Sequence, residues 1–268
     1  MATRRYRESI TATVNRKGVL DIDTVKGCAI GMAQHPGGGC YGLCYAAKMA
    51  DLYGYDFASS VSRAIRDENP KQMELFDGRL RGGPKTVFRM VKNHSLDWFR
   101  IGTMGDPSHD WELTVDLCEW LGGLRTPVIV TKHWKAIPDT LLKRMNAIGA
   151  VMNTSISPLD TMEERNQRLQ QFRRVQKTGM KSVLRIVSCR FGDTEKGRRL
   201  SAIQDRLFQN CPVIDNPLRI PQRDQRVDCG HIRVEKIRDM NQETYVSRNN
   251  ENTYIGHCSG CPDQCGVV

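Results

Sequence analysis

The feature that most constrains this chain is a regular alternation of short apolar runs and longer amphipathic stretches, which begins near residue 95. The apolar runs predict buried strands at residues 97–104, 126–134, 150–157, 181–188 and 212–220. The amphipathic stretches predict helices at residues 111–124, 137–149, 158–179 and 194–208. Strands that alternate with helices form parallel sheets with right-handed crossovers, and continuously apolar strands are covered on both faces. The chain is therefore predicted to be an α/β protein.

Counting the segment around Cys28 as a first strand gives six β/α steps, which predicts a partial (β/α)6 barrel of the TIM type over residues 1–220. In such a barrel the chemistry takes place at the carboxyl ends of the strands. The polar residues at these ends are Asp106, Lys132, His133, Asn153, Ser155, Ser157, Arg185, Ser188, Arg190, Asp215 and Asn216.

The remaining composition indicates a cytoplasmic protein. The chain has 268 residues, and its amino-terminal sequence MATRRYRES lacks the apolar core of a signal peptide. No apolar run is long enough to span a membrane, so we expect no membrane partner. Because the cytoplasm keeps thiols reduced, the ten cysteines indicate metal binding or catalysis rather than disulfides. Cys118 and Cys189 lie within a helical and a strand pattern and are expected to be core residues.

Three of the other cysteines, Cys28, Cys40 and Cys44, surround the glycine run 37–39. Three thiolates from one loop can occupy three positions of a metal or cluster and leave the fourth position open for a substrate or cofactor. Glycines allow backbone conformations closed to other residues, so the loop can wrap closely around an inorganic core. Pro36 would stiffen the entry to this loop.

A loop with three cysteines followed by β/α steps resembles the radical S-adenosylmethionine (SAM) superfamily over residues 25–220. The spacing here is C-x11-C-x3-C, where the usual family spacing is C-x3-C-x2-C. The run around Cys40 and Cys44 is similar to that of a phage-associated radical-SAM-like group. In that group a strand ending in a Ser-Met-x-Asp-like motif and a later Leu-Thr-Lys strand recur, which GTMGD (102–106) and VTK (130–132) resemble.

The resemblance implies that Cys28, Cys40 and Cys44 hold a [4Fe-4S] cluster whose open iron is chelated by SAM. An external electron donor then drives cleavage of SAM to a 5′-deoxyadenosyl radical. It implies that Gly102, Thr103 and Asp106 hold the SAM amine, although Asp106, Ser108 or Asp110 could instead cap a helix. Further SAM contacts implied by the resemblance are Asn153 and Ser155 to the ribose, and Arg185 and Arg190 to the carboxylate. Tyr41 or Tyr45 would lie beside the cluster, or be a core tyrosine.

The carboxyl-terminal residues 221–268 are predicted to be a Cys-rich metal-binding extension. Cys258, Cys261 and Cys265 lie in a loop rich in Gly, Ser and Pro, and the C-x2-C half indicates a metal site. Cys229 could be the fourth ligand, with His231 and His257 as rivals. A closed site of this kind is either zinc or an auxiliary [4Fe-4S] cluster, and the resemblance favours the cluster.

The net charge of +10 suits a polyanionic partner, and basic residues gather at residues 79–92 and 173–185. The candidate phosphate contacts are Arg79, Arg81, Lys85, Arg173, Arg174 and Lys177. We therefore expect a radical SAM enzyme that modifies or rearranges a base in nucleic acid, DNA rather than RNA, with a hypermodified phage pyrimidine as one candidate. The alternatives are a radical SAM enzyme acting on a small metabolite or peptide, and a non-catalytic nucleic-acid-binding protein with zinc.

Overall fold

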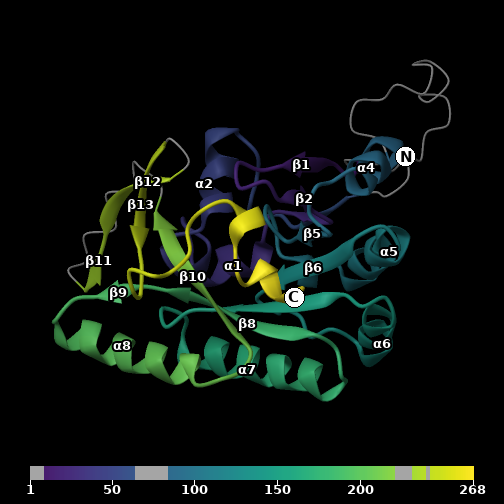
Figure 1. The fold of residues 1–268 in the computed structure, drawn as a ribbon. Coiled ribbons are helices and arrows are strands. Elements are labelled where there is room, and N and C mark those ends of the chain that lie inside the picture. The colour runs from purple at the N-terminus through teal and green to yellow at the C-terminus, as the bar shows by residue number, and fades with distance from the viewer. Residues whose placement is uncertain (1–8, 64–83, 221–230, 240–241) are drawn as a thin grey trace, which may run out of the picture.

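The computed structural model describes residues 9–63, 84–220, 231–239 and 242–268, and its largest feature is a sheet of nine strands (Figure 1). Six of these strands are parallel and adjacent in chain order: β2 (Leu20–Ile22), β5 (Trp98–Ile101), β6 (Thr126–Thr131), β7 (Val151–Ile156), β8 (Ser182–Ser188) and β10 (Val213–Ile220). Three antiparallel strands extend it: β1 (Ala12–Val14) beside β2, then β13 (Gln242–Ser247) and β12 (Glu235–Asp239) beyond β10. The predicted α/β class and parallel sheet are confirmed.

The predicted helices are also present, with start and stop signals that explain their bounds. They are α5 (Trp111–Gly122), α6 (Asp139–Ala147), α7 (Met162–Lys177) and α8 (Glu195–Phe208). A capping box begins α7, because Thr161 and Glu164 satisfy each other's backbone amides. Gly149 and Gly179 follow α6 and α7 with φ of 67° and 80°, a conformation that glycine adopts readily and that ends a helix.

The prediction of a first strand at Cys28 is wrong. The first parallel strand is the buried β2, and the chain then leaves the sheet through β3 (Val25–Lys26), which pairs with β4 (Val61–Ser62). Cys28 lies at the amino terminus of a short helix, α1 (Ala29–Gln34). The reason is that β2 has only three residues, too few to produce a periodic pattern, while the apolar residues near Cys28 belong to the helix.

The remaining elements are short. They comprise α2 (Tyr45–Leu52), α4 (Pro84–Lys92), the pair β9 (Arg190–Phe191) and β11 (Ile232–Arg233), and 3-10 turns at Cys40–Gly42, Pro107–His109, Cys258–Gly260 and Gln264–Gly266. None of the helices in the described ranges is long and apolar enough to cross a membrane.

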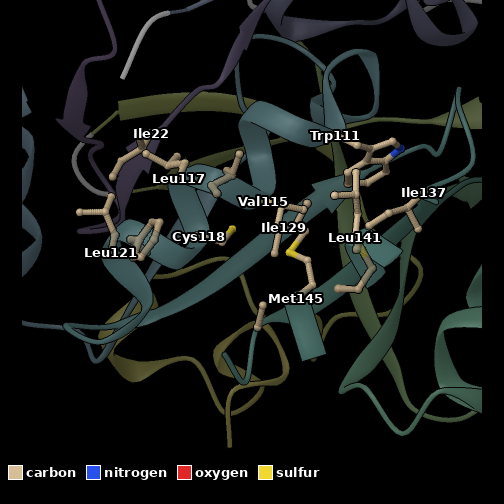
Figure 2. Packing of buried hydrophobic residues seen from close by; sticks show 14 of the residues in the cluster. Ile22, Trp111, Val115, Leu117, Cys118, Leu121, Ile129, Ile137, Leu141 and Met145 are labelled. Atoms are coloured by element: carbon tan, nitrogen blue, oxygen red, sulfur yellow. The ribbon is translucent and has the colours of Figure 1, made fainter. Parts of the chain in front are cut away.

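Two different layers cover the two faces of the sheet. On one face α5 and α6 pack against β5 and β6, and Figure 2 shows Val115 and Met145 beside Ile129. Cys118 is fully buried in this layer, as predicted for a core residue. Fully burying one Leu, Ile or Met side chain contributes about 1.5–3 kcal/mol. Because several such side chains are buried here, this layer is a main source of stability.

The opposite face of the sheet is covered by the carboxyl-terminal segment. Cys265, Cys258 and Val267 pack against a row of buried side chains from successive strands, which includes Trp98, Val128, Val151, Val183 and Ile214. Figure 1 shows this segment on the side of the sheet away from α7 and α8. The predicted extension therefore lies directly on the sheet, and two of its strands continue the sheet beyond β10.

Candidate functional site

The three amino-terminal cysteines gather in one place, which we call the N-terminal cysteine site (Cys28, Cys40 and Cys44). Cys28 immediately precedes α1 and Cys44 immediately precedes α2, while Cys40 begins the turn between them. The turn is folded tightly, because the Cys44 amide donates to the Gly38 carbonyl at 2.8 Å.

Glycines bring the backbone of this loop close to the cysteines. A Cβ added to Gly39, whose φ is 60°, would lie 2.5 Å from Cys44 Cβ. A Cβ added to Gly31 would lie 2.8 Å from Cys28 Sγ. Both distances are shorter than non-bonded atoms allow, so neither position accepts a larger residue without displacing a cysteine. Gly37 and Gly39 have φ of 78° and 60°, the kind of backbone conformation predicted for this glycine run, while the wrapping of an inorganic core stays a prediction.

The thiols of the site act on one another electrostatically. Burial raises the pKa of Cys28, and the negative charges of Asp106, Cys40 and Cys44 raise it further. Burial also raises the pKa of Cys40 to about 12, although Lys132 opposes the shift. The Nε2 atom of His109 lies 3.6 Å from Cys28 Sγ. Cys28 is buried and Cys40 and Cys44 are half-buried. Positive charge is therefore needed before Cys28 and Cys40 can ionise.

A buried ionic network forms the wall of the site beside Cys40. Lys132, at the carboxyl end of β6, places Nζ 3.1 Å from Asp160 Oδ1. Arg168 of α7 is 0% exposed, contacts Asp160, and lies 3.7 Å from Glu164. The carboxylate of Glu164 in turn lies 3.1 Å from His35, on the loop that carries the cysteines. The network thus connects the cysteine loop to the ends of β6 and β7.

The two tyrosines predicted to flank the site differ in placement. The ring of Tyr41 lies 4.8 Å from Lys132 Nζ, and its side chain packs with Leu43 and Leu159. Burial raises the pKa of Tyr41 well above its usual value, as do the nearby Asp160, Cys40 and Cys44. Tyr45 is 55% exposed. Of the two, Tyr41 is the one beside the cysteines.

The loop 102–106 packs directly against the strand that leads to Cys28. Gly27 N donates to the Met104 carbonyl at 3.0 Å, and a Cβ on Gly105 would lie 2.3 Å from the Val25 carbonyl oxygen. Gly102 has a φ of 101°, and its Cβ would lie 2.1 Å from the Val130 carbonyl oxygen. The glycines of this motif are therefore required for backbone-to-backbone contact.

Asp23 is a buried carboxylate that the sequence reasoning missed. It follows β2 and accepts hydrogen bonds from Thr103 N at 2.6 Å and Gly102 N at 3.3 Å. Burial raises the pKa of Asp23, against the effect of the Thr103 and Met104 amides. The Thr103 hydroxyl is buried and has no hydrogen-bond partner among the described residues. Because the strand before Asp23 is so short, no local pattern marks this residue.

Asp106 has a structural role in this fold. Its Oδ1 accepts from Ser108 N at 2.9 Å and from the Thr131 hydroxyl at 2.7 Å, and its Oδ2 accepts from Lys132 N at 2.7 Å. The helix-capping alternative is confirmed for Asp110, which caps α5 by accepting from Leu113 N at 3.1 Å, whereas Asp106 caps the 3-10 turn Pro107–His109. Asp106 therefore ties the end of β5 to the end of β6.

The candidate residues on β7 and β8 face the carboxyl-terminal segment. Asn153 Nδ2 donates to the Cys265 carbonyl at 2.9 Å, and its Oδ1 is buried without a partner among the described residues. Arg185 Nη1 lies 3.5 Å from Cys265 Sγ, and Nη2 donates to Asn216 Oδ1 at 2.7 Å. Ser155 pairs with Arg185 across the two strands. Arg190 belongs to the short β9, where its amide donates to the Ser247 hydroxyl at 2.7 Å.

The second triplet, Cys258, Cys261 and Cys265, which we call the C-terminal cysteine loop, lies over the same face. Burial raises the pKa of Cys258, as do the neighbouring Cys265 and Cys261, while Arg100 and Lys17 oppose the shift. The loop is anchored by Cys258 N, which donates to the Lys17 carbonyl at 2.9 Å. These three thiols therefore share one partly buried, positively charged neighbourhood.

The rival donors for this loop are differently placed. His257 lies next to Cys258 in sequence, and its Nδ1 is 2.7 Å from the Ser259 hydroxyl. The His231 carbonyl accepts from Gly192 N at 2.9 Å, beside β9. Cys229 lies outside the described residues, so its assignment as fourth ligand stays a prediction. In the part of the chain that the structure describes, no three His, Cys, Asp or Glu side chains are already arranged as ligands of one metal ion.

Several residues of the wall beside Cys40 were not predicted as functional. Asp160 and Arg168 lie in residues 158–179, for which the sequence predicts only an amphipathic helix. The one available signal is the spacing of Glu164 and Arg168, which places them on the same side of α7.

Comparison of the chain with known family models, with curated proteins and with solved structures finds no match. The function is therefore argued from these residues.

Proposed function

We propose that this protein is a radical SAM enzyme in which Cys28, Cys40 and Cys44 bind a [4Fe-4S] cluster. The observation that carries the proposal is the meeting of three thiols beside the carboxyl ends of β5 and β6, where enzymes built on parallel β/α units place their chemistry. The six parallel strands in chain order are the arrangement expected of a partial (β/α)6 barrel.

The residues present fit such a cluster in three ways. The donor set is three cysteines, which leaves one iron position open. The glycines at positions 31 and 39 approach the cysteines so closely that no side chain would fit between them. Lys132 and Arg168 supply positive charge beside Cys40, which favours thiolate ligands. A bound cluster would supply the electron that cleaves SAM to a 5′-deoxyadenosyl radical, which takes a hydrogen atom from the substrate.

The surrounding residues support binding of SAM in two places. Near Cys28 the buried Thr103 hydroxyl has no partner in the described chain and can donate to a ligand, while Gly102 and Asp23 hold this loop in place. Asp106 can still accept from an ammonium group, although both its oxygens already accept hydrogen bonds. On the sheet face the unpartnered Asn153 oxygen is the corresponding candidate, with Ser155 and Arg185 nearby.

The C-terminal cysteine loop is proposed to hold a second [4Fe-4S] cluster, with zinc as the alternative. Arg100 and Lys17 compensate negative charge at Cys258, and Arg185 approaches Cys265, so the neighbourhood suits thiolate ligands. An external electron donor and SAM are the implied partners of the first site. The proposed substrate is a base within nucleic acid, with DNA favoured over RNA and a hypermodified phage pyrimidine as one candidate.

Metal analysis after anaerobic reconstitution tests the proposal. If both sites hold a [4Fe-4S] cluster, the wild-type protein should contain about eight iron and eight sulfide per chain. If the C-terminal cysteine loop holds zinc instead, it should contain about four iron, four sulfide and one zinc. Replacing Cys28, Cys40 and Cys44 by Ala should remove about four iron and abolish dithionite-dependent cleavage of SAM. Replacing Cys258, Cys261 and Cys265 by Ala should remove only the other metal.

The matched control is Cys211→Ala, which removes an exposed thiol that belongs to neither triplet. This variant should keep the full metal content. Iron that is unchanged in the variant lacking Cys28, Cys40 and Cys44 would contradict the cluster assignment. Zinc without iron in the wild-type protein would favour the non-catalytic alternative.

A further inference from the structure

A groove of about 570 Å³ runs between α7 and α8 on the helical side of the sheet. Four arginines line it, two from each helix: Arg165 and Arg173 from α7, and Arg199 and Arg206 from α8. The other lining side chains are apolar or amides, and none is an Asp or Glu. The groove therefore presents concentrated positive charge without an acidic residue in its walls.

Three of these four arginines have no side-chain partner among the described residues, unlike the neighbouring Arg174. Arg174, next to Arg173, forms an ion pair with Asp139 of α6. In the described chain Arg173, Arg199 and Arg206 form no side-chain ion pair or hydrogen bond, and all three are exposed. Of the predicted basic cluster at residues 173–185, the structure thus places Arg173 in the groove. Arg79 and Arg81 lie outside the described residues, and Lys85 is exposed on α4.

The spacing of the charges suits a chain of phosphates. Helical residues rise about 1.5 Å each, so Arg165 and Arg173 are about 12 Å apart along α7, and Arg199 and Arg206 about 10 Å apart along α8. One strand of a nucleic acid carries a phosphate about every 3.4 Å of helix axis, and more widely spaced phosphates when it is stretched. The arginines of one row are therefore about three phosphates apart, so the two rows match several phosphates along a strand better than a single small anion.

The groove is connected to the cysteine site through one loop. Arg165 donates to the backbone carbonyls of Pro158 and Asp160. The side chain of Asp160 holds Lys132 and Arg168 in the wall beside Cys40. A strand lying in the groove would thus approach the loop that forms one wall of the proposed active site.

We infer that the groove between α7 and α8 binds the phosphate backbone of a polynucleotide strand and guides that strand toward the N-terminal cysteine site. The inference deepens the proposed function, because it rests on a nucleic-acid substrate for that site. Arginine suits this role, since its planar guanidinium pairs with phosphate oxygens in a bidentate manner.

Fluorescence anisotropy with a single-stranded DNA oligonucleotide, and with the RNA of the same sequence, tests the inference. The variant carries Arg173→Glu, Arg199→Glu and Arg206→Glu. Its matched control carries Arg16→Glu, Lys143→Glu and Arg238→Glu, which change the net charge equally at exposed positions outside the two predicted basic clusters. Affinity is measured at several salt concentrations between about 50 and 200 mM, where phosphate contacts give their log-linear dependence.

Each phosphate contact on a single strand contributes about −0.7 to the slope of log affinity against log salt, so losing three contacts should make the slope shallower by about 2. The control variant should keep a slope close to that of the wild type. Equal weakening in both variants, or no binding by the wild type at low salt, would overturn the inference. Comparing the two oligonucleotides decides whether the strand is DNA or RNA.

A measurement on the wild-type protein covers the case in which the groove variant fails to fold. Phenylglyoxal modifies accessible arginines, and mass spectrometry locates the adducts. The bound oligonucleotide should protect Arg173, Arg199 and Arg206 but not Arg238, which is exposed on β12. Equal protection of Arg238 would overturn the inference. If the protein binds the strand through the groove but holds no iron, only the proposed radical SAM chemistry is contradicted. If it cleaves SAM but binds no strand, only the inference about the groove is overturned.

Discussion

Asp160→Asn is the perturbation for which the structure gives the clearest magnitude. Asp160 is 3% exposed, and its carboxylate contacts Lys132 and Arg168 and accepts from Ser157 N at 2.6 Å. Asparagine has nearly the same shape and can keep the bond to Ser157 N, but it removes the negative charge. Among the described carboxylates, Arg168 would then retain only Glu164 at 3.7 Å, which also contacts His35, besides its bond to the Lys132 carbonyl.

Removing one partner of a buried ion pair costs about 3–5 kcal/mol, because the other charge is left uncompensated. For a protein of this size about 1 kcal/mol lowers the melting temperature by about 2–4 °C, so we expect a decrease of about 6–20 °C. The control is Asp139→Asn, which breaks an ion pair whose carboxylate is 78% exposed. An exposed pair is worth about 0–1 kcal/mol, so this variant should melt close to the wild type.

Two further measurements separate the charge effect from a general loss of packing. Lys132→Met in the Asp160→Asn background removes one of the two cations that have lost the Asp160 charge. It should therefore recover part of the stability that Asp160→Asn loses. Burial by itself would raise the pKa of Asp160, but Lys132 and Arg168 hold the pKa below its usual value of 3.8. The stabilisation is therefore present above that pH and is lost as the pH falls through the lowered pKa, so the two proteins should converge in acid. A loss of less than about 1 kcal/mol at neutral pH would refute the reasoning.

The remaining predictions concern backbone geometry and capping. Gly102→Ala should destabilise the protein by about 1–3 kcal/mol in urea unfolding, because alanine is strained at a φ of 101° and its Cβ would meet the Val130 carbonyl; unchanged stability would show that the loop 102–106 can relax. Thr161→Ala should cost about 0.5–2 kcal/mol through loss of the α7 cap, while Thr161→Ser should restore most of it; if serine is no better than alanine, the capping bond is not responsible.

Local pattern was enough to predict the regular part of the fold. The strands β5, β6, β7, β8 and β10 lie in segments rich in apolar residues, and amphipathic helices follow the first four, so both periods appear within a few residues. The gathering of Cys28, Cys40 and Cys44 also follows from the sequence, because they are close in the chain and separated by glycines that allow a tight turn. The buried position of Cys118 follows from its place on the apolar side of α5.

Tertiary structure decided what depends on residues distant in the chain. The contact of Asn153 with the Cys265 carbonyl joins residues 112 positions apart, and it places the C-terminal cysteine loop on the sheet face. The buried pairing of Lys132 with Asp160 depends on how the ends of β6 and β7 meet. Arg173 and Arg174 are adjacent and chemically identical, yet one lines the groove and the other pairs with Asp139. Local periodicity reports which side chains are buried, whereas the partner of each buried or charged group is fixed only when separate elements pack together.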